Sequence, residues 1–396
     1  MTTLDPQAIL AGRTPGRPSI KLMVGMVVTS LCALTALVLF ALLGGGANFF
    51  VCVGLAVLPV PIMVAAVLLL DRLEPEPTRD LVFAFLWGAG VAVLGALVLN
   101  TLGLKYVTEP VFGDQGRFWT TVAGAPVVEE ALKGAVLFVL LWFRRNEIDG
   151  VTDGFVYAAM VALGFAMMEN VSYYLQALDG GGTQRLEAVF VLRGVVAPFC
   201  HPLFTAMTGL GVAYAANRRT GRVTALVLGL LAAMLLHALW NAGTLMGAGG
   251  LAVVYALNFV LLVVLLTLVF LERRTLVRQI GHYLPGYLHT GLVTPQDIVM
   301  LGRIPLRREA RRWARSIGGK GAARAMSDYQ LAATELVLLH RRMDNGVIDV
   351  PFFARRRGEL LRLMVVARQA LAISRIPAGP AAPPPWGPSG FAPPPG

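Results

Sequence analysis

Charged residues are scarce in this chain of 396 residues. They make up 14% of the sequence, while hydrophobic residues make up 56%. Soluble globular domains carry about 25% charged residues and somewhat fewer apolar ones. The shortage of charge therefore excludes a set of ordinary soluble domains and indicates a membrane protein.

Cysteine is rare too, with only Cys32, Cys52 and Cys200 in the sequence. All three lie in apolar stretches, and none is paired at a metal-type spacing such as C-x-x-C. The sequence therefore predicts neither a disulfide framework nor a cysteine metal site.

Apolar runs long enough to cross a bilayer follow one another through the first two thirds of the chain. A spanning helix needs about 20 mainly apolar residues. The first run is too long for the apolar part of a signal peptide, so we expect it to be retained. The sequence predicts an all-α polytopic membrane protein with about eight transmembrane helices, at about 22–43, 47–70, 81–104, 122–143, 155–178, 189–215, 223–246 and 249–271.

Basic residues in the short loops predict the orientation. With the N-terminus in the cytoplasm, ten Lys and Arg residues fall on the cytoplasmic side and four on the outer side. This is the asymmetry that the positive-inside rule describes. Eight crossings return the chain to its starting side, so both termini of this cell-membrane protein are predicted to be cytoplasmic.

The net charge of +11 comes from the C-terminal third. Residues 1–271 hold 15 basic and 15 acidic residues, whereas residues 272–396 hold 19 and 8. Thr294 and Pro295 form a helix-start signal, and nine of the last twenty residues are proline. We expect four parts: a cytoplasmic N-terminal segment (1–19), a transmembrane domain (20–271), a basic helical tail (272–376) and a disordered proline-rich end (377–396).

The arginine-rich stretch from Arg303 to Arg315 has two interpretations. It could contact acidic lipid headgroups, because basic segments next to a membrane are attracted to them. It could also be a solvated helix face beside the membrane. Nucleic acid is not an expected partner, and the oligomeric state is left open.

Polar residues within the predicted spans are the strongest functional signal. A charged group at the centre of a spanning helix costs about 3 kcal/mol on insertion scales, so such residues are functional candidates. Counting at about 1.5 Å per residue puts the carboxylates and imidazoles at one level, roughly 12 to 18 Å below the outer surface. Four consecutive spans carry these residues, which are Glu129, Glu130 and Lys133, then Glu169 and Asn170, then His201, then His237 and Asn241.

Prolines mark the same level. Pro126 suits the first turn of a helix, so the fourth span is expected to begin within the membrane near the glutamate pair. Pro198 and Pro202 flank His201 and free backbone groups from their helical partners. In a membrane, such groups must face protein or a water-filled cavity. Water at this level is what a hydrolytic reaction needs.

The residue types predict a zinc site. Two imidazoles and one carboxylate are typical of catalytic zinc, which keeps a fourth position for water. The predicted ligands are Glu169, His201 and His237. A bound zinc ion would lower the pKa of its water to about 7.

The remaining polar residues have predicted roles around that ion. One of Glu129 and Glu130 is expected to act as the general base, with Glu130 favoured, while the other binds metal or is held by Lys133. Lysine is rare in this chain, and Lys133 follows Glu129 at the i,i+4 spacing of an ion pair. Asn241 is expected to donate to the oxyanion or to orient a ligand.

Four segments resemble the motifs of one protein family, in the same order. The sequence is similar to the PrsW family of intramembrane metalloproteases, which is related to the CAAX prenyl endopeptidases and the bacterial self-immunity proteins. The resemblance covers roughly residues 80–246 and leaves the tail outside. It rests on Glu129-Glu130-Ala131-Leu132-Lys133, on Asp153 to Tyr157 with Leu163 to Asn170, on Pro198 to His201, and on His237 to Asn241.

The resemblance implies cleavage of membrane-anchored proteins. In the founding case of the family the substrate is a single-pass anti-sigma factor, cut near its extracytoplasmic side, which suits a site in the outer half of the membrane. This chain departs from the pattern at Ala158 and Ala162, where glycines are common, and the polar set stays intact.

Two other classes of protein remain as alternatives. Intramembrane glutamates and histidines also build ion relays, so a proton- or cation-coupled transporter is the second hypothesis. The sequence lacks the internal inverted repeat of many transporters. A non-catalytic membrane scaffold that recruits partners through its basic tail is the third.

Overall fold

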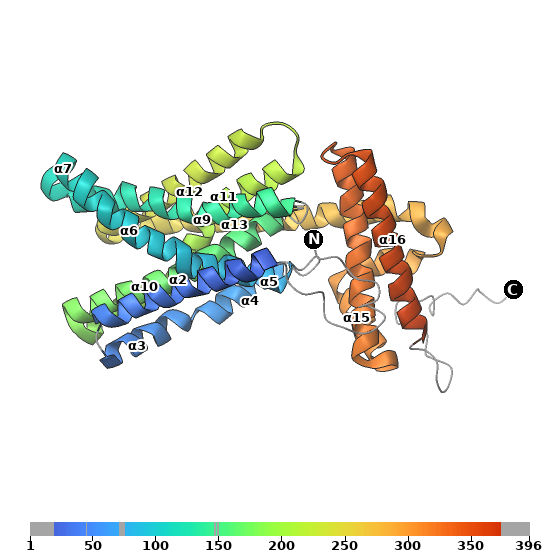
Figure 1. Ribbon diagram of the computed structural model, residues 1–396, viewed down its shortest axis with the longest axis horizontal. Helices are drawn as coiled ribbons and strands as arrows, with labels where there is room; N and C mark the ends of the chain where they lie inside the picture. Colours follow the sequence, from blue (N-terminus) through green and yellow to red (C-terminus); the bar gives the residue numbers. More distant parts are fainter. Residues whose placement is uncertain (1–19, 45, 71–75, 146–147, 149, 374–396) are drawn as a thin grey trace.

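The computed structural model describes residues 20–373, apart from residues 45, 71–75, 146–147 and 149. Every regular element in this part of the chain is a helix, so the all-α prediction is confirmed (Figure 1). Long helices form one bundle, and a smaller bundle that contains α15 and α16 lies across one end of it (Figure 1). The predicted segments 1–19 and 377–396 lie outside the described residues.

The long bundle contains the predicted spans. From the start of the described chain to the helix that carries Glu129 and Glu130, its helices are α2 (Ile20–Gly44), α3 (Gly46–Val57), α4 (Val60–Leu70), α5 (Thr78–Trp87), η1 (Gly88–Ala92), α6 (Val93–Gly103), η2 (Leu104–Thr108), α7 (Glu109–Phe112), η3 (Gly113–Gln115), α8 (Gly116–Trp119), η4 (Thr120–Gly124) and α9 (Ala125–Arg144). The others are α10 (Val151–Phe190), η6 (Val191–Val196), α11 (Cys200–Asn217), α12 (Arg222–Leu245) and α13 (Gly247–Tyr283).

Six continuous helical stretches of the described residues are long and apolar enough to cross a membrane. Two of them, Thr78–Phe143 and Val151–Asn217, have 66 and 67 residues, far more than the roughly 20 that one crossing needs. Each doubles back at a glycine with positive φ, Gly113 in the first and Gly182 in the second. The chain is thus a polytopic membrane protein, and the eight crossings remain a prediction.

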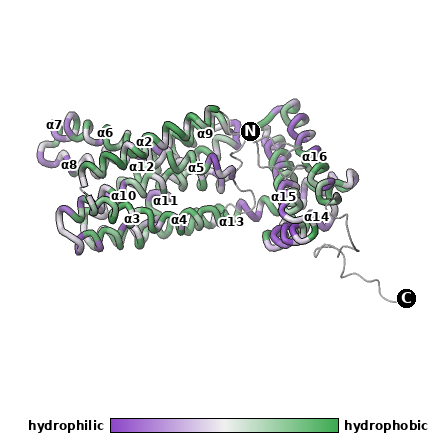
Figure 2. Tube along the Cα trace, turned by 60° about the horizontal axis from the view of Figure 1, so that its bottom comes forward, coloured by the Kyte–Doolittle hydropathy of each residue, from purple (hydrophilic) through white to green (hydrophobic). Residues whose placement is uncertain are grey.

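The helices of the long bundle consist mostly of hydrophobic residues (Figure 2), and large apolar side chains such as Leu31, Val227 and Phe259 are exposed on it, as lipid requires. The most apolar stretch of Leu22–Leu42 is only 11% buried inside the protein. By contrast, the most apolar stretch of Val151–Asn217 is 83% buried, so α10 forms the centre of the bundle. A β-carbon on Gly154 would lie 2.3 Å from the carbonyl oxygen of Gly209, which shows how closely α10 and α11 approach.

The backbone is irregular close to the polar residues. The helix breaks between η6 and α11, where Ala197 has φ −121° and ψ 31°, as the prolines around His201 predict. At Pro126 the expectation was wrong in one respect. Pro126 does lie in the first turn of α9, but the π-helical turn η4 precedes α9 without a break, because Gly124 keeps helical φ and ψ. The helix therefore has no free positive end beside the glutamates.

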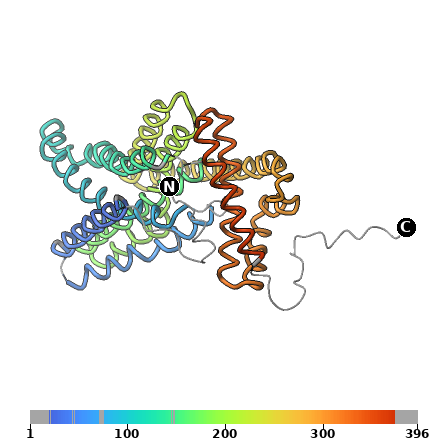
Figure 3. The backbone as a smooth tube through the Cα atoms, turned by 45° about the vertical axis from the view of Figure 1, so that its right-hand side comes forward, coloured from blue at the N-terminus to red at the C-terminus, as the bar shows by residue number. Residues whose placement is uncertain are grey.

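The tail is a helical bundle with its own core. It contains the end of α13, then η7 (Leu284–Thr290), α14 (Pro295–Leu301), α15 (Ile304–Asp344) and α16 (Val350–Ile373). Thr294 caps α14 by accepting a hydrogen bond from the backbone N–H of Asp297, as the sequence predicts. Buried Leu284, Met300 and Leu336 belong to the core of this bundle. A second view shows the bundle beyond the same end of the spans (Figure 3).

The two bundles are joined by a continuous helix. α13 runs through the predicted boundary at residues 271 and 272, so the division into domains remains a prediction. Just past the boundary, Glu272 accepts hydrogen bonds of 2.7 Å from the backbone N–H groups of Val151 and Thr152. Its carboxylate therefore caps the N-terminus of α10, the central helix.

Candidate active site

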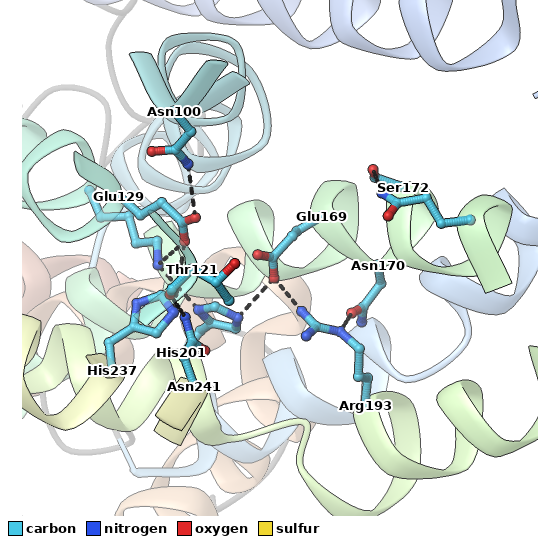
Figure 4. Close-up of polar contacts among 12 residues, drawn as sticks. Asn100, Thr121, Glu129, Glu169, Asn170, Ser172, Arg193, His201, His237 and Asn241 are labelled. Carbon is cyan, nitrogen blue, oxygen red and sulfur yellow. Dashed lines mark hydrogen bonds and ion pairs between the residues drawn. The ribbon is translucent and has the colours of Figure 1, made fainter. Parts of the chain in front are cut away.

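The predicted polar residues of four spans meet in the long bundle (Figure 4). α9 contributes Glu129, Glu130 and Lys133, α10 contributes Glu169, α11 contributes His201 and α12 contributes His237. All except Glu169 are at most 8% exposed. The sequence-based expectation that these residues share one level is consistent with this arrangement.

Glu130 is held by three neighbours and is fully buried. Its Oε1 atom accepts a hydrogen bond from Lys133 Nζ at 2.7 Å and lies 3.0 Å from His237 Nδ1. Its Oε2 atom accepts a hydrogen bond from Thr205 Oγ1 at 2.8 Å. Both carboxylate oxygens are therefore occupied, and the contact to Nδ1 leaves His237 Nε2 free to bind a ligand.

Glu129 is buried but only partly satisfied. Its Oε1 atom accepts a long hydrogen bond of 3.4 Å from Asn100 Nδ2. Its Oε2 atom has no hydrogen-bond partner among the described residues, but it forms the predicted i,i+4 ion pair with Lys133 at 3.8 Å and lies 3.9 Å from His237 Nε2. A buried carboxylate oxygen without a hydrogen bond is costly, so this atom favours a further cation or a proton.

Lys133 is the cation at the centre of the site. The residue is fully buried, and its ammonium contacts Glu130 at 2.7 Å and His201 Nδ1 at 3.1 Å. The ammonium also lies 4.0 Å from the centre of the Phe165 ring. These contacts satisfy a charge that apolar surroundings would otherwise expel.

Glu169 links His201 to a residue that sequence reasoning did not assign to the site. Its Oε2 atom lies 3.0 Å from His201 Nε2 and forms an ion pair with Arg193, whose Nε donates to Asn170 Oδ1 at 2.7 Å. Arg193 falls within the predicted sixth span, 189–215. This position could have assigned Arg193 to the site, because a charge within a span needs a partner.

Asn241 lies at the edge of the site. Its Nδ2 atom donates to the carbonyl oxygen of Thr121 at 2.8 Å, in the π-helical turn that precedes α9 (Figure 4). This bond joins α12 to the segment that leads to the glutamate pair. The predicted role at the oxyanion remains a prediction.

Sequence reasoning also missed two neutral residues, Asn100 and Thr205. Asn100 was visible as an amide within the predicted third span. Thr205 follows His201 by one helical turn, so it shares a face of α11 with that histidine. Threonine is common in spanning helices, and its spacing alone carried no specific signal.

Three of the side chains are arranged so that they could hold a metal ion. One ligand atom each from Glu129, His201 and His237 lies within 4.8 Å of the other two. The predicted ligand set contained Glu169 in place of Glu129, so the two sets differ by one carboxylate. The donor types suit zinc, and one oxygen of Glu129 lacks a hydrogen bond among the described residues.

A mostly apolar cavity opens beside the histidines. Its volume is about 30 Å³, enough for a water molecule or two, and His201, Arg193 and Asn170 form its polar part. The rest of the wall comes from α3, α4, α10, the break before α11, and Trp240. Water could therefore reach His201 between apolar walls.

The comparisons with known proteins agree with this site. The family described as PrsW family intramembrane metalloprotease matches residues 76–269, which include all the polar residues above. Protease PrsW of Bacillus subtilis (strain 168) is 32% identical over 170 residues, which cover 42% of this chain and 70% of that protein. The chain belongs to the PrsW family.

Other PrsW relatives give the same result. Protease PrsW of Oceanobacillus iheyensis is 31% identical over 150 residues, which cover 38% of this chain and 66% of the relative. That of Clostridioides difficile is 27% identical over 190 residues, covering 47% and 76%. No solved structure gives a significant match. The chain is thus a multi-pass membrane protein in a family of membrane proteases, and the tail beyond residue 269 lies outside the family match.

Proposed function

We propose that this protein is an intramembrane metalloprotease that hydrolyses peptide bonds of membrane-anchored proteins. The observation that carries the proposal is the buried group of Glu129, His201 and His237, with one carboxylate oxygen that lacks a hydrogen-bond partner among the described residues. The family match adds the reaction class, since its description is that of a metalloprotease.

We assign the ion, taken to be zinc, to Glu129, His201 and His237. An ion held there would supply Lewis acidity, which activates water and polarises the scissile carbonyl. Glu130 orients His237 through Nδ1, and Lys133 balances the excess negative charge of the glutamate pair. Neither residue is free to accept a proton from water while it keeps these contacts.

Glu169 is the better candidate for the general base, in place of Glu130. Its side chain is 16% exposed, whereas that of Glu130 is fully buried. It lies next to His201, on the side where Asn170 and Arg193 border the cavity. Arg193 keeps the carboxylate oriented, and a proton taken from water by Glu169 could pass to the leaving amine.

The depth of the site suggests where substrates are cut. Glu169 precedes the turn at Gly182 by 13 residues, and His237 precedes the turn at Gly247 by 10. At about 1.5 Å per residue, the site lies roughly 15 to 20 Å from the end of the bundle that carries these turns. If the tail is cytoplasmic, as the loop charges predict, cleavage takes place in the outer half of the membrane.

The test is a search for new protein ends in cells that produce the full chain. Mass spectrometry would compare the N-termini of single-pass membrane proteins between the wild type and Glu129→Gln. We expect termini near the outer membrane surface with the wild type, and their loss in Glu129→Gln, His201→Ala and His237→Ala. Lys105→Gln, which changes an exposed residue, is the matched control and should cleave as the wild type does.

Two results would contradict the proposal. The first is the same set of termini in Glu129→Gln at equal protein level. The second is a cation flux in proteoliposomes that Glu129→Gln abolishes while no protein is cut, which would favour the transporter.

A further inference from the structure

A cleft lined by basic side chains lies in the tail, outside the family match. α15 folds back on itself where Gly318 and Gly319 leave the helical conformation, with φ 65° at Gly319. The two halves of the hairpin line an open groove of about 790 Å³. Its cationic wall consists of Arg308, Arg311, Arg312, Arg315, Lys320 and Arg324.

The helical period explains why these charges gather. Arg308, Arg312 and Arg315 recur at spacings of four and three residues, so they share one face of the first half of α15. Lys320 and Arg324 share a face of the second half in the same way. The turn at the two glycines brings both faces together.

Four arginines of this cleft lack acidic partners among the described residues. No carboxylate of the described residues lies within ion-pair distance of Arg308, Arg311, Arg312 or Arg315, whereas Arg368 in the same bundle pairs with Asp297. Burial and the nearby charge of Arg308 lower the pKa of Arg311. The cleft therefore holds repelling charges that an anion would neutralise.

The hairpin is built firmly enough to keep these charges in place. Arg307, by contrast with its neighbours, is buried and donates to the carbonyl oxygen of Leu301 and to Thr334 Oγ1, both at 2.8 Å. Gln330 accepts a hydrogen bond of 2.8 Å from Arg311 and donates one of 3.0 Å to the carbonyl oxygen of Arg307. The cleft is thus held across the two halves of α15 by neutral hydrogen-bond partners.

We propose that this cleft is a binding site for phosphate groups, carried either by a soluble polyphosphorylated compound or by the headgroups of acidic lipids. Planar guanidinium groups match phosphate oxygens two at a time, which favours phosphate over isolated carboxylates. α15 and α16 run across the direction of the spans (Figures 1 and 3), so a bilayer crossed by the long bundle would lie parallel to a long side of the tail bundle.

The proposal is tested by calorimetry on the full chain in neutral detergent. One arm adds sodium tripolyphosphate, and the other adds dihexanoyl phosphatidylglycerol, so that the soluble and lipid sources are distinguished. Arg312→Gln with Arg315→Gln removes two charges from the cleft. The control is Arg355→Gln with Arg362→Gln, which removes two charges from exposed positions of α16.

We expect one or both phosphate probes to bind the wild type at one site per chain. The cleft variant should bind at least tenfold more weakly, and the control should stay within about twofold. The single change Arg312→Gln should give an intermediate loss, which excludes misfolding as the cause. Equal losses in the cleft variant and the control would overturn the proposal. So would a pentaglutamate peptide that binds as tightly as either phosphate probe, or no binding of either.

Discussion

Cations in the membrane bundle and cations in the tail are treated differently by this fold. Lys133 and Arg193, between the spans, each contact at least one carboxylate. Arg308, Arg312 and Arg315, in the tail cleft, contact none among the described residues. A charge in apolar surroundings must be neutralised by the protein itself, whereas water can solvate an unpaired one.

The difference separates two kinds of site. In the spans, the protein supplies both signs of charge, so the polar group is nearly complete and one oxygen of Glu129 lacks only a hydrogen bond among the described residues. In the tail cleft, four arginines have no acidic partner among the described residues, so a ligand must supply the negative charge. Paired charges within the spans are therefore typical of a catalytic site, whereas the unpaired arginines of the tail cleft favour the binding of an anion.

The largest effect is expected from removal of the paired cation. Lys133→Met should destabilise the protein by about 3 to 5 kcal/mol, because it leaves Glu130 as an uncompensated buried charge. Arg312→Met in the cleft should change stability by less than about 0.5 kcal/mol. Thermal unfolding of the two variants in detergent measures the contrast. Equal effects would break the comparison between the regions.

The ion pair of Glu169 and Arg193 gives the next largest effect. Each single change, Glu169→Gln or Arg193→Met, should cost about 2 kcal/mol, because the partner stays behind in a partly buried place. The double variant should cost clearly less than the sum, since one interaction is removed in both cases. Additive losses in unfolding experiments would mean that the two charges act independently.

Glu272 lies where the two regions meet. Glu272→Gln keeps its shape but loses the charge that caps α10, so a loss of about 1 kcal/mol is expected. Glu187→Gln, at an exposed position, is the control and should leave the unfolding temperature unchanged. The same loss in both variants would remove the capping role.

The smallest effect concerns Asp328, next to the cleft. Burial raises its pKa from 3.8 to about 6, although Arg324 acts in the opposite direction. The folded state therefore prefers the neutral acid, and this stability, present below pH 4, is lost as the pH rises through 6. Asp328→Asn should be more stable than the wild type at pH 8, by about 1 kcal/mol after allowance for solvent screening, and equal to it at pH 4. A wild-type advantage at pH 8 would contradict this.

Most of the residues that meet at the site could be predicted from the sequence, but the contacts between them could not. An error of two residues in a span boundary shifts a side chain by about 3 Å along the helix and by about 200° around it. The predicted depth of a side chain therefore changes little with such an error, whereas the direction in which it points changes completely. This is why Glu129, Glu169, His201 and His237 were brought together correctly, while the ligand set differs by one carboxylate.

The missed features have local physical causes. Arg193 lies within the predicted span 189–215, but residue types alone do not show that Glu169 on the preceding span is its partner. The π-helical turn before Pro126 needs only a small shift in hydrogen bonding, which leaves no signal in residue types. In the tail, the hairpin of α15 depends on Gly318 and Gly319, and neither was used to divide the predicted helical bundle.

The central claim is that Glu129, His201 and His237 hold a metal ion and that Glu169 acts beside it. Its most direct test is the zinc content of the purified full chain, set against cleavage, in Glu129→Gln and Glu169→Gln. We predict that Glu129→Gln loses both zinc and cleavage, while Glu169→Gln keeps its zinc and loses at least a hundredfold in cleavage. Zinc lost from Glu169→Gln and retained in Glu129→Gln would contradict this assignment and restore Glu169 as the ligand.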